Sequence, residues 1–339
     1  MTGEDGGGGY GRYVEVVNVV PGRTPSKPKP RRLANTSRDL AGEAVLASVT
    51  VEPYGLVMIR LMSWNMKHLD LWDEIGVQGA DVALLQEVPP PPGHADGAHQ
   101  RCAACPEEVL PAISEAWRTA GWEKRPWRTA IARVTDAVQL EPVLTGDMTG
   151  TDAQALVLSR AGTITAANLT ANGEHLFTAA SVYSPWERPV GRNEPCWADG
   201  SAHRILSDLA PILWDQRRRP VVVAGDWNIL FGYGEHGDVS FAQRYQTVFD
   251  RAESLGLRFV GPQHPNGRQA DPWPEELPKA SRCVPTFHHS QQKPETATRQ
   301  LDFVFASSGI ADKVNVRALN DPDDWGPSDH CRSIIDVDV

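Results

Sequence analysis

Asp226 and Asn228 stand at the end of a short apolar run and offer one carboxylate and one amide for chemistry. The run over residues 221–223 consists of valines, which predicts a strand buried on both faces, and Gly225 is expected to let the backbone turn sharply at its end. Two residues apart in extended chain, the two side chains would point to the same side and converge on one bound group. The carboxylate could orient or deprotonate a water while the amide donates to an oxyanion. The alternative is a turn that only caps a structural strand.

Other apolar runs also start or stop at a polar residue, at Asn65, Glu87, Tyr183, Asp302 and the pair Asp329 and His330. Taken singly, each position has a structural explanation as a cap, a salt bridge or an anchored core residue. Taken together they describe one site, because strand ends at one edge of a sandwich meet in space. Their residue types suit phosphoester hydrolysis, in which a hard cation needs oxygen ligands, a water needs a base and the phosphate needs donors.

The elements that must position these side chains are predicted from the spacing of apolar residues. Strands are expected over residues 58–66, 81–88, 155–160, 163–169, 175–183, 221–226, 300–305 and 333–337. Asn172 and Gly173, between two of these runs, predict a hairpin. Helices are expected over residues 106–120, 201–218 and 240–256, with Ser201 as the N-cap of the second.

Short motifs spread along the chain carry a resemblance to a known family. They are Ser-Trp-Asn at 63–65, Leu-Gln-Glu-Val at 85–88, Val-Tyr-Ser-Pro at 182–185, Gly-Asp-Trp-Asn at 225–228, Gln-Leu-Asp-Phe-Val at 300–304 and Pro-Ser-Asp-His at 327–330. In order and spacing they resemble the endonuclease/exonuclease/phosphatase superfamily over residues 58–339. The resemblance implies an α+β fold, a four-layered α/β/β/α sandwich of two mixed β-sheets flanked by helices.

The resemblance also implies Mg²⁺ or Mn²⁺ at one edge of the sandwich. Glu87 resembles the principal metal ligand, with Asn65 beside it, and Asp329 resembles the family's variable metal contact. The residue types agree, because hard cations are bound by carboxylate and carbonyl oxygens.

Further roles follow from the same resemblance. Asp226 resembles the residue that orients or deprotonates the attacking water, and Asn228 and Tyr183 resemble donors that contact the phosphate. His330 resembles the imidazole that faces the phosphate, and Asp302 resembles the carboxylate that holds its tautomer. Which of these residues is the general base stays open.

The substrate class is less closely defined. A net charge of −10 means that no overall basic field draws the protein onto nucleic acid. A polyanion must therefore be bound by contacts at a local site. At position 183 this sequence has a tyrosine, in which it resembles the abasic-site endonucleases. Relatives of pancreatic deoxyribonuclease carry a histidine at the same place in the motif. The leading hypothesis is a metal-dependent phosphodiesterase or nuclease that acts on nucleic acid. The alternatives are a phosphomonoesterase acting on a small-molecule or lipid-headgroup phosphate, and a catalytically inactive binding module on the same scaffold.

The first part of the chain differs from the rest in composition. Residues 1–57 are rich in glycine and proline without periodicity, which predicts a disordered tail, and translation could also begin at Met58. His94, His99, Cys102 and Cys105 could hold a structural Zn²⁺, although a lone Cys-x-x-Cys favours a surface loop.

Targeting signals are not evident in the sequence. No stretch approaches the roughly 18 apolar residues of a membrane span, and the start lacks the basic and apolar regions of a signal peptide. Five cysteines without an export signal favour free thiols or a metal site over disulfides. We therefore expect a cytoplasmic monomer.

Overall fold

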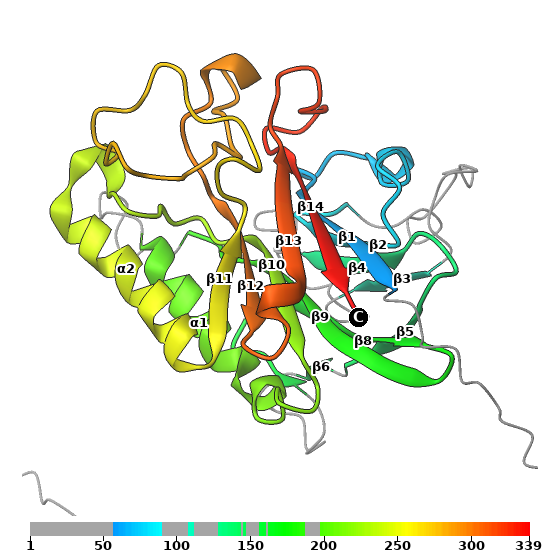
Figure 1. Cartoon of the computed structure of the whole chain (residues 1–339). Coiled ribbons are helices and arrows are strands. Elements are labelled where there is room, and N and C mark those ends of the chain that lie inside the picture. The colour runs from blue at the N-terminus through cyan, green and yellow to red at the C-terminus, as the bar shows by residue number, and fades with distance from the viewer. Residues whose placement is uncertain are drawn as a thin grey trace, which may run out of the picture. The chain divides into compact units, whose positions relative to one another are not determined.

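The computed structural model describes residues 57–89, 108–111, 128–143, 145–146, 156–160, 162–186 and 197–339 (Figure 1). The tail expected over residues 1–57 lies outside these ranges except for Val57. The four residues of the zinc hypothesis, His94, His99, Cys102 and Cys105, also lie outside them. Among the described residues, no helix has the length and apolar content needed to cross a bilayer.

Strands dominate the described part of the chain. In order they are β1 (Met58–Asn65), β2 (Val82–Gln86), β3 (Glu108–Pro111), β4 (Thr129–Arg133), β5 (Gln139–Pro142), β6 (Thr145–Gly146), β7 (Leu156–Val157), β8 (Ile164–Ala171), β9 (Glu174–Tyr183), β10 (Val221–Asp226), β11 (Leu257–Gly261), β12 (Asp302–Ser307), β13 (Val314–Leu319) and β14 (Arg332–Asp338). The helices are α1 (Ala198–Leu213) and α2 (Val239–Ser254), with short 3-10 helices η1 (Trp72–Glu74), η4 (Glu235–Gly237), η5 (Pro294–Thr296) and η6 (Ala311–Lys313).

Two mixed six-stranded sheets form the centre of the fold. The first has the order β13-β14-β1-β2-β4-β3 and the second the order β11-β12-β10-β9-β8-β5, while β6 and β7 form a small separate pair. The parallel pairs are β1 with β2 and β9 with β10, and the other pairs within the two large sheets are antiparallel. The hairpin predicted at Asn172 and Gly173 joins β8 to β9.

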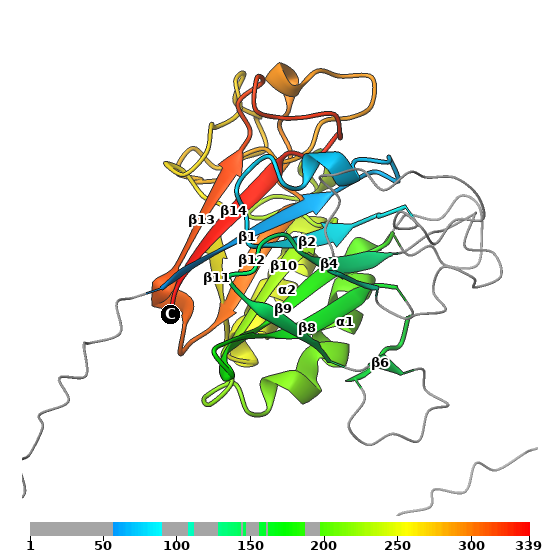
Figure 2. The ribbon, with the colours of Figure 1, turned by 90° about the vertical axis from the view of Figure 1, so that its right-hand side faces the viewer.

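The two sheets pack face to face through an apolar core (Figure 2). Alternate residues of β1 and β14, such as Leu61 and Ile335, meet alternate residues of β10 and β12, such as Val222 and Val304. The neighbouring Val223 points the other way, toward the helices. This two-sided burial explains the run of valines, because each fully buried valine stabilises the fold by about 1.5–3 kcal/mol.

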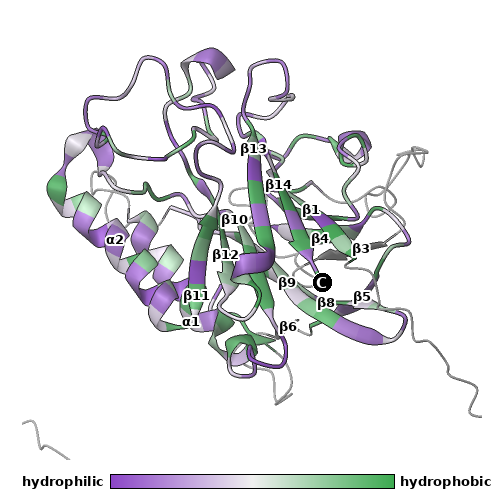
Figure 3. Cartoon of the chain, in the orientation of Figure 1, coloured by the Kyte–Doolittle hydropathy of each residue, from purple (hydrophilic) through white to green (hydrophobic). Residues whose placement is uncertain are grey.

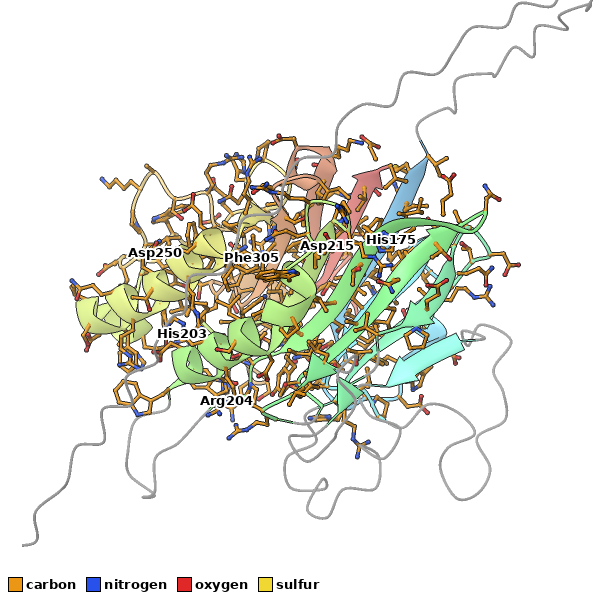
Figure 4. All side chains as sticks on the ribbon, turned by 90° about the horizontal axis from the view of Figure 1, so that it is seen from below. His175, His203, Arg204, Asp215, Asp250 and Phe305 are labelled. Carbon is orange, nitrogen blue, oxygen red and sulfur yellow. The ribbon has the colours of Figure 1, made fainter. Side chains whose placement is uncertain are left out.

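Helices α1 and α2 cover the outer face of the second sheet. Leu206 and Leu209 of α1 and Phe249 of α2 pack against strands β9, β10 and β12. Seen from below, Phe305 of β12 lies between the sheet and the helices, where its ring contacts Phe249 at a centroid distance of 5.6 Å (Figure 4). The amphipathic pattern of both helices is therefore a consequence of this packing.

The outer face of the first sheet has a different cover in the described part of the chain. Met62, Trp64 and Leu85 on that face pack against Trp72 of η1 and Ile75 in the loop that follows it. With the helices on the other side, this arrangement confirms the predicted sandwich of two mixed sheets with flanking layers.

Two local predictions were wrong. Residues 108–111, expected at the start of a helix, form strand β3 and pair with β4, because backbone pairing at the sheet edge overrides the helical spacing of the apolar residues. The rest of that expected helix lies outside the described residues. Helix α1 begins at Ala198 and Ser201 is buried inside it, so Ser201 is not its N-cap.

Three long connections gather at one end of the sandwich, drawn at the top of Figure 1. They are the loops over residues 66–81, 262–301 and 320–331. They touch one another, since the His288 N–H donates to the Asp329 carbonyl and the Lys67 ammonium pairs with the Asp329 carboxylate. The loops are largely hydrophilic, in contrast to the strands below them (Figure 3).

Candidate active site

The loop-covered end of the sandwich holds all the polar residues that the sequence pattern singles out. The first sheet supplies Asn65 at the end of β1, Glu87 just after β2, and Asp329 and His330 just before β14; the second supplies Tyr183 at the end of β9, Asp226 and Asn228 at the end of β10, and Asp302 at the start of β12. Within the second sheet Asp226 pairs in register with both Tyr183 and Asp302. The site is therefore a seam between the two sheets.

Gly225 allows the strands that carry Asp226 to approach closely. Its φ is +155°, and a Cβ at this position would lie 1.9 Å from the carbonyl oxygen of Val182 on β9. The prediction that Gly225 turns the chain sharply was wrong, since β10 continues through it to Asp226. The glycine is needed because a side chain would push β9 and β10 apart.

Asp226 and Asn228 do converge, but through a turn. Asn228 has a left-handed φ of 51°, so the chain is not extended between them as predicted. The Asn228 backbone N–H donates to Asp226 Oδ1 at 3.0 Å, and its Nδ2 donates to Asp226 Oδ2 at 3.1 Å and to the Ser184 carbonyl at 3.0 Å. This local arrangement positions the Asp226 carboxylate.

Asn65 connects the two sheets across the site. Its Nδ2 donates to Glu87 Oε1 at 3.0 Å and to Asp226 Oδ2 at 2.9 Å, while its Oδ1 accepts the backbone N–H of Lys67 at 2.9 Å. In this orientation the amide presents its nitrogen to the carboxylates. Asn65 therefore holds Glu87 and Asp226 together as a donor.

His330 and Asp302 form a buried pair next to Asp226. His330 Nδ1 donates to Asp302 Oδ2 at 2.8 Å, and the Thr286 hydroxyl accepts the Asp302 backbone N–H at 3.1 Å. Burial alone would lower the pKa of His330, but the carboxylates of Asp302 and Asp226 outweigh it and raise the pKa to about 10. The imidazole is thus held in one orientation with its Nε2 directed toward Asp226.

Nε2 of His330 and Oδ2 of Asp226 lie 3.8 Å apart, which is too far for a direct hydrogen bond. Burial raises the pKa of Asp226 to about 8; the positive charge of His330 opposes the shift, and the charges of Asp302 and Glu87 add to it. A carboxylate with a pKa near neutrality is a stronger base than an ordinary aspartate. Asp226 and His330 can therefore exchange a proton with a third group that lies between them.

Glu87 differs from Asp226 in charge. Burial opposes its ionisation, but the hydrogen bonds and charge supplied by His68 and Asn65 lower the pKa of Glu87 to about 2. Burial, together with the nearby charges of Glu87 and Asp226, raises the pKa of the Tyr183 hydroxyl well above its usual value. At neutral pH the site thus combines an ionised carboxylate with a protonated phenol.

These residues fit a hard divalent cation. Glu87 and Asp329 are carboxylates at the site, and oxygen ligands are those that Mg²⁺ and Mn²⁺ prefer. Among the described residues, Asp226, Asp302 and His330 also bring ligand atoms within 4.8 Å of one another. His330 Nδ1 is bonded to Asp302 and both Asp226 oxygens accept hydrogen bonds, so this second set is better suited to proton transfer.

The structure adds residues that the sequence pattern did not reveal. Lys67 and His68 each pair with a carboxylate of the site, Asp329 and Glu87 respectively. The available signal was their position two and three residues after Asn65, and it does not specify partners so distant in sequence.

The tryptophans beside the motifs serve the structure. Trp227 and Trp325 are fully buried, so neither can stack on a substrate base. Trp186 is partly buried, and its indole N–H donates to Asn228 Oδ1 at 2.8 Å. Trp64 donates its indole N–H to the His330 carbonyl at 3.0 Å and so helps to place that histidine.

Comparison with known proteins gives a consistent result for the fold. The model of the Endonuclease/Exonuclease/phosphatase family matches residues 62–330. A search of curated protein sequences finds no match.

Solved structures with this fold include two endonucleases and one further catalytic domain. The AP endonuclease LMAP from Leishmania major has a TM-score of 0.55 at 14% identity, covering 83% of this chain and 88% of its own. The Xenopus laevis APE2 catalytic domain has a TM-score of 0.54 at 16% identity, covering 83% and 93%. The endonuclease domain of TRAS1, a telomere-specific non-LTR retrotransposon, has a TM-score of 0.50 at 16% identity, covering 83% and 98%. At these identities the similarity establishes a shared fold.

Proposed function

This chain belongs to the endonuclease/exonuclease/phosphatase family, and from that premise we propose that it is a metal-dependent phosphoester hydrolase, specifically a phosphodiesterase or nuclease acting on nucleic acid. The observation that carries the proposal is the buried network around Asp226. Asn65 and Asn228 hold this carboxylate between ionised Glu87 and the His330–Asp302 pair. A site that only bound a ligand would have no need for so costly a concentration of buried carboxylates.

Each residue has a role that follows from its geometry. Glu87 would hold a Mg²⁺ or Mn²⁺ ion, which when bound neutralises charge on the phosphoryl oxygens. Asp226 orients or deprotonates the attacking water, since its raised pKa makes it an effective base. His330, held by Asp302, donates through Nε2 to a phosphoryl oxygen, and the Tyr183 hydroxyl lies where it can do the same.

Asn228 is better placed to act through Asp226 than on the phosphate. Both hydrogens of its amide are already donated, to Asp226 and to the Ser184 carbonyl, and its oxygen accepts from Trp186. We therefore assign it the positioning of Asp226.

A phosphomonoesterase acting on a small-molecule or lipid-headgroup phosphate is the second candidate. The net charge of −10 favours it, because a long polyanion is repelled by an acidic protein whereas a single phosphate is not. Two of the similar solved structures are named as endonucleases, which favours the first candidate.

The decisive experiment is an assay of Mg²⁺-dependent hydrolysis with plasmid DNA, single-stranded DNA, RNA and a panel of phosphomonoesters. We expect cleavage of at least one nucleic acid and its loss in excess chelator. Turnover of phosphomonoesters alone would favour the second candidate, and full activity in chelator would exclude metal dependence.

The matched variant is Glu87→Gln, which removes the charge that attracts the cation and keeps the shape of the side chain. We expect it to abolish hydrolysis, with kcat reduced by about 1,000-fold or more. This reduction corresponds to the loss of about 4 kcal/mol of transition-state stabilisation. Thermal unfolding should show that the fold remains. Glu253→Gln, on the exposed face of α2, is the control and should retain activity.

A further inference from the structure

Lys67 and His68, the second and third residues after Asn65, place a basic side chain against each carboxylate proposed to bind the metal. Lys67 Nζ lies 2.8 Å from Asp329 Oδ2, and His68 Nε2 lies 2.8 Å from Glu87 Oε2. Asp329 also acts on the pKa of His330 and of Tyr183, so its charge lies within reach of the rest of the site. Lys67 therefore stands beside one member, Asp329, of an acidic cluster formed by Glu87, Asp226, Asp302 and Asp329.

The backbone shows that this placement is built into the fold. Lys67 and His68 have left-handed φ values of 53° and 58°, and Glu87 has 47°. Such conformations cost roughly 1–2 kcal/mol for each residue that is not glycine. They are held by hydrogen bonds from the Lys67 N–H to Asn65 Oδ1 at 2.9 Å and from the His68 N–H to the Glu87 carbonyl at 2.7 Å.

The two partners of the Lys67 pair differ in how exposed they are and in how firmly they are held. The Asp329 side chain is 13% exposed, and its backbone carbonyl accepts a hydrogen bond from the His288 N–H, which fixes the loop. The Lys67 side chain is 38% exposed and ends a flexible four-carbon stem. The ammonium can therefore leave Asp329 without any change in the fold, whereas Asp329 cannot follow it.

We propose that the Lys67 ammonium competes with a divalent cation for Asp329, so that the ion is held at the Glu87 end of the cluster and binds less tightly than the carboxylates alone would allow. The inference rests on the proposed metal-dependent function. Its physical basis is that two cations cannot occupy one carboxylate without strong repulsion. Removing the ammonium makes Asp329 available as a further oxygen ligand for the ion.

The test is calorimetric titration of the full chain with Mn²⁺, in a double-mutant cycle of Lys67→Met and Asp329→Asn. We expect Lys67→Met to tighten Mn²⁺ binding about tenfold while Asp329 is present, as expected for removal of a close positive charge. In the Asp329→Asn background the same change should tighten binding less than about threefold, because only long-range repulsion is relieved. Lys313→Met, at the exposed end of η6, is the matched control and should leave the affinity unchanged.

Equal gains in both backgrounds, or no gain in either, would overturn the inference. Glu87→Gln separates this failure from that of the proposed function. Mn²⁺ binding that is lost in Glu87→Gln but unaffected by Lys67→Met would remove the inference alone. Absence of Mn²⁺ binding to the wild type would remove both. Should Lys67→Met fail to fold, as judged by thermal unfolding without metal, Lys67→Gln takes its place with the same expectations.

Discussion

At the scale of single residues, Asp226 is the common partner of the site. It accepts hydrogen bonds from Asn65 and Asn228 and lies 3.8 Å from His330. Because this carboxylate contacts several residues at once, a substitution at Asp226 also alters the surroundings of those residues. The residues around it should therefore behave as a unit when they are substituted.

We predict that Asp226→Ala and His330→Ala are strongly non-additive in their effect on kcat. If both act on the same proton transfer, either change alone removes the step, so each should lower kcat at least 100-fold and the double variant hardly further. Single-turnover rates of the three variants with the best substrate give the comparison. Losses that multiply would show that the two residues act in separate steps.

The raised pKa of His330 predicts a pH dependence of stability in metal-free protein. Its folded pKa of about 10 exceeds the ordinary value of 6.5, so the stabilisation is complete below pH 6.5 and is lost as the pH rises through 10. Asp226, whose pKa is raised to about 8, changes stability in the same direction. We expect the free energy of unfolding to fall by a few kcal/mol, on the order set by linkage, between these limits. Urea titrations with chelator present measure it.

Asp302→Asn is the informative variant for this pH dependence. It removes a carboxylate that raises the pKa of His330, so its stability should vary less between pH 6.5 and 10 than that of the wild type. An unchanged slope would mean that Asp302 does not hold the charge on the imidazole.

At the scale of elements, the ends of adjacent strands determine which side chains meet. Strands β9, β10 and β12 bring Tyr183, Asp226 and Asp302 into one row, and this row depends on the close approach of β9 and β10 at Gly225. In the first sheet the start of β14 is held against β1 and η1, where the Arg332 guanidinium stacks on Trp64 at 4.3 Å and pairs with Glu74 at 2.9 Å. The geometry of the candidate site thus relies on buried contacts of both sheets.

We predict that Gly225→Ala destabilises the protein by several kcal/mol, because its Cβ would meet the Val182 carbonyl at 1.9 Å and neither strand can move freely. Chemical denaturation measures the loss. Gly309→Ala, where an added Cβ meets nothing within 4 Å, is the control and should change stability by less than about 1 kcal/mol. Near-equal stabilities of the two variants would contradict the packing argument.

At the scale of the whole molecule, the charge of −10 limits how the protein can hold a polyanion. Binding that depends on many lysine and arginine contacts weakens steeply with salt, since each neutralised phosphate releases counterions. An acidic protein must rely on the metal and a few local contacts. Affinity for nucleic acid should then depend weakly on ionic strength.

We predict that the slope of log affinity against log salt is shallower than about −3, which corresponds to about three phosphate contacts. Fluorescence anisotropy of labelled DNA with Asp226→Ala, which is predicted to be nearly inactive and keeps Glu87 for the metal, tests this prediction between 50 and 300 mM salt with Mg²⁺ present. A slope near −6 would require a basic surface and contradict it.

The sequence by itself determined the fold class and indicated the polar residues that the fold brings to one end of the sandwich. Strand runs such as residues 221–226 are visible because burial imposes a short-range apolar pattern, and a polar residue that ends such a run is visible for the same reason. The motif order then pointed to one family, whose model matches residues 62–330. The apolar runs and the polar residues that end them can be recognised because they depend on residues close together in the chain.

Only the tertiary structure decided the pairings. Strand β3 formed where a helix was predicted, because pairing with β4 outweighs local spacing. Lys67 meets Asp329 because β1 pairs with β14 within the first sheet, and Asn65 meets Asp226 because the two sheets pack against each other. Side-chain contacts between distant segments depend on non-local packing, which leaves no periodic signal in the sequence around either partner.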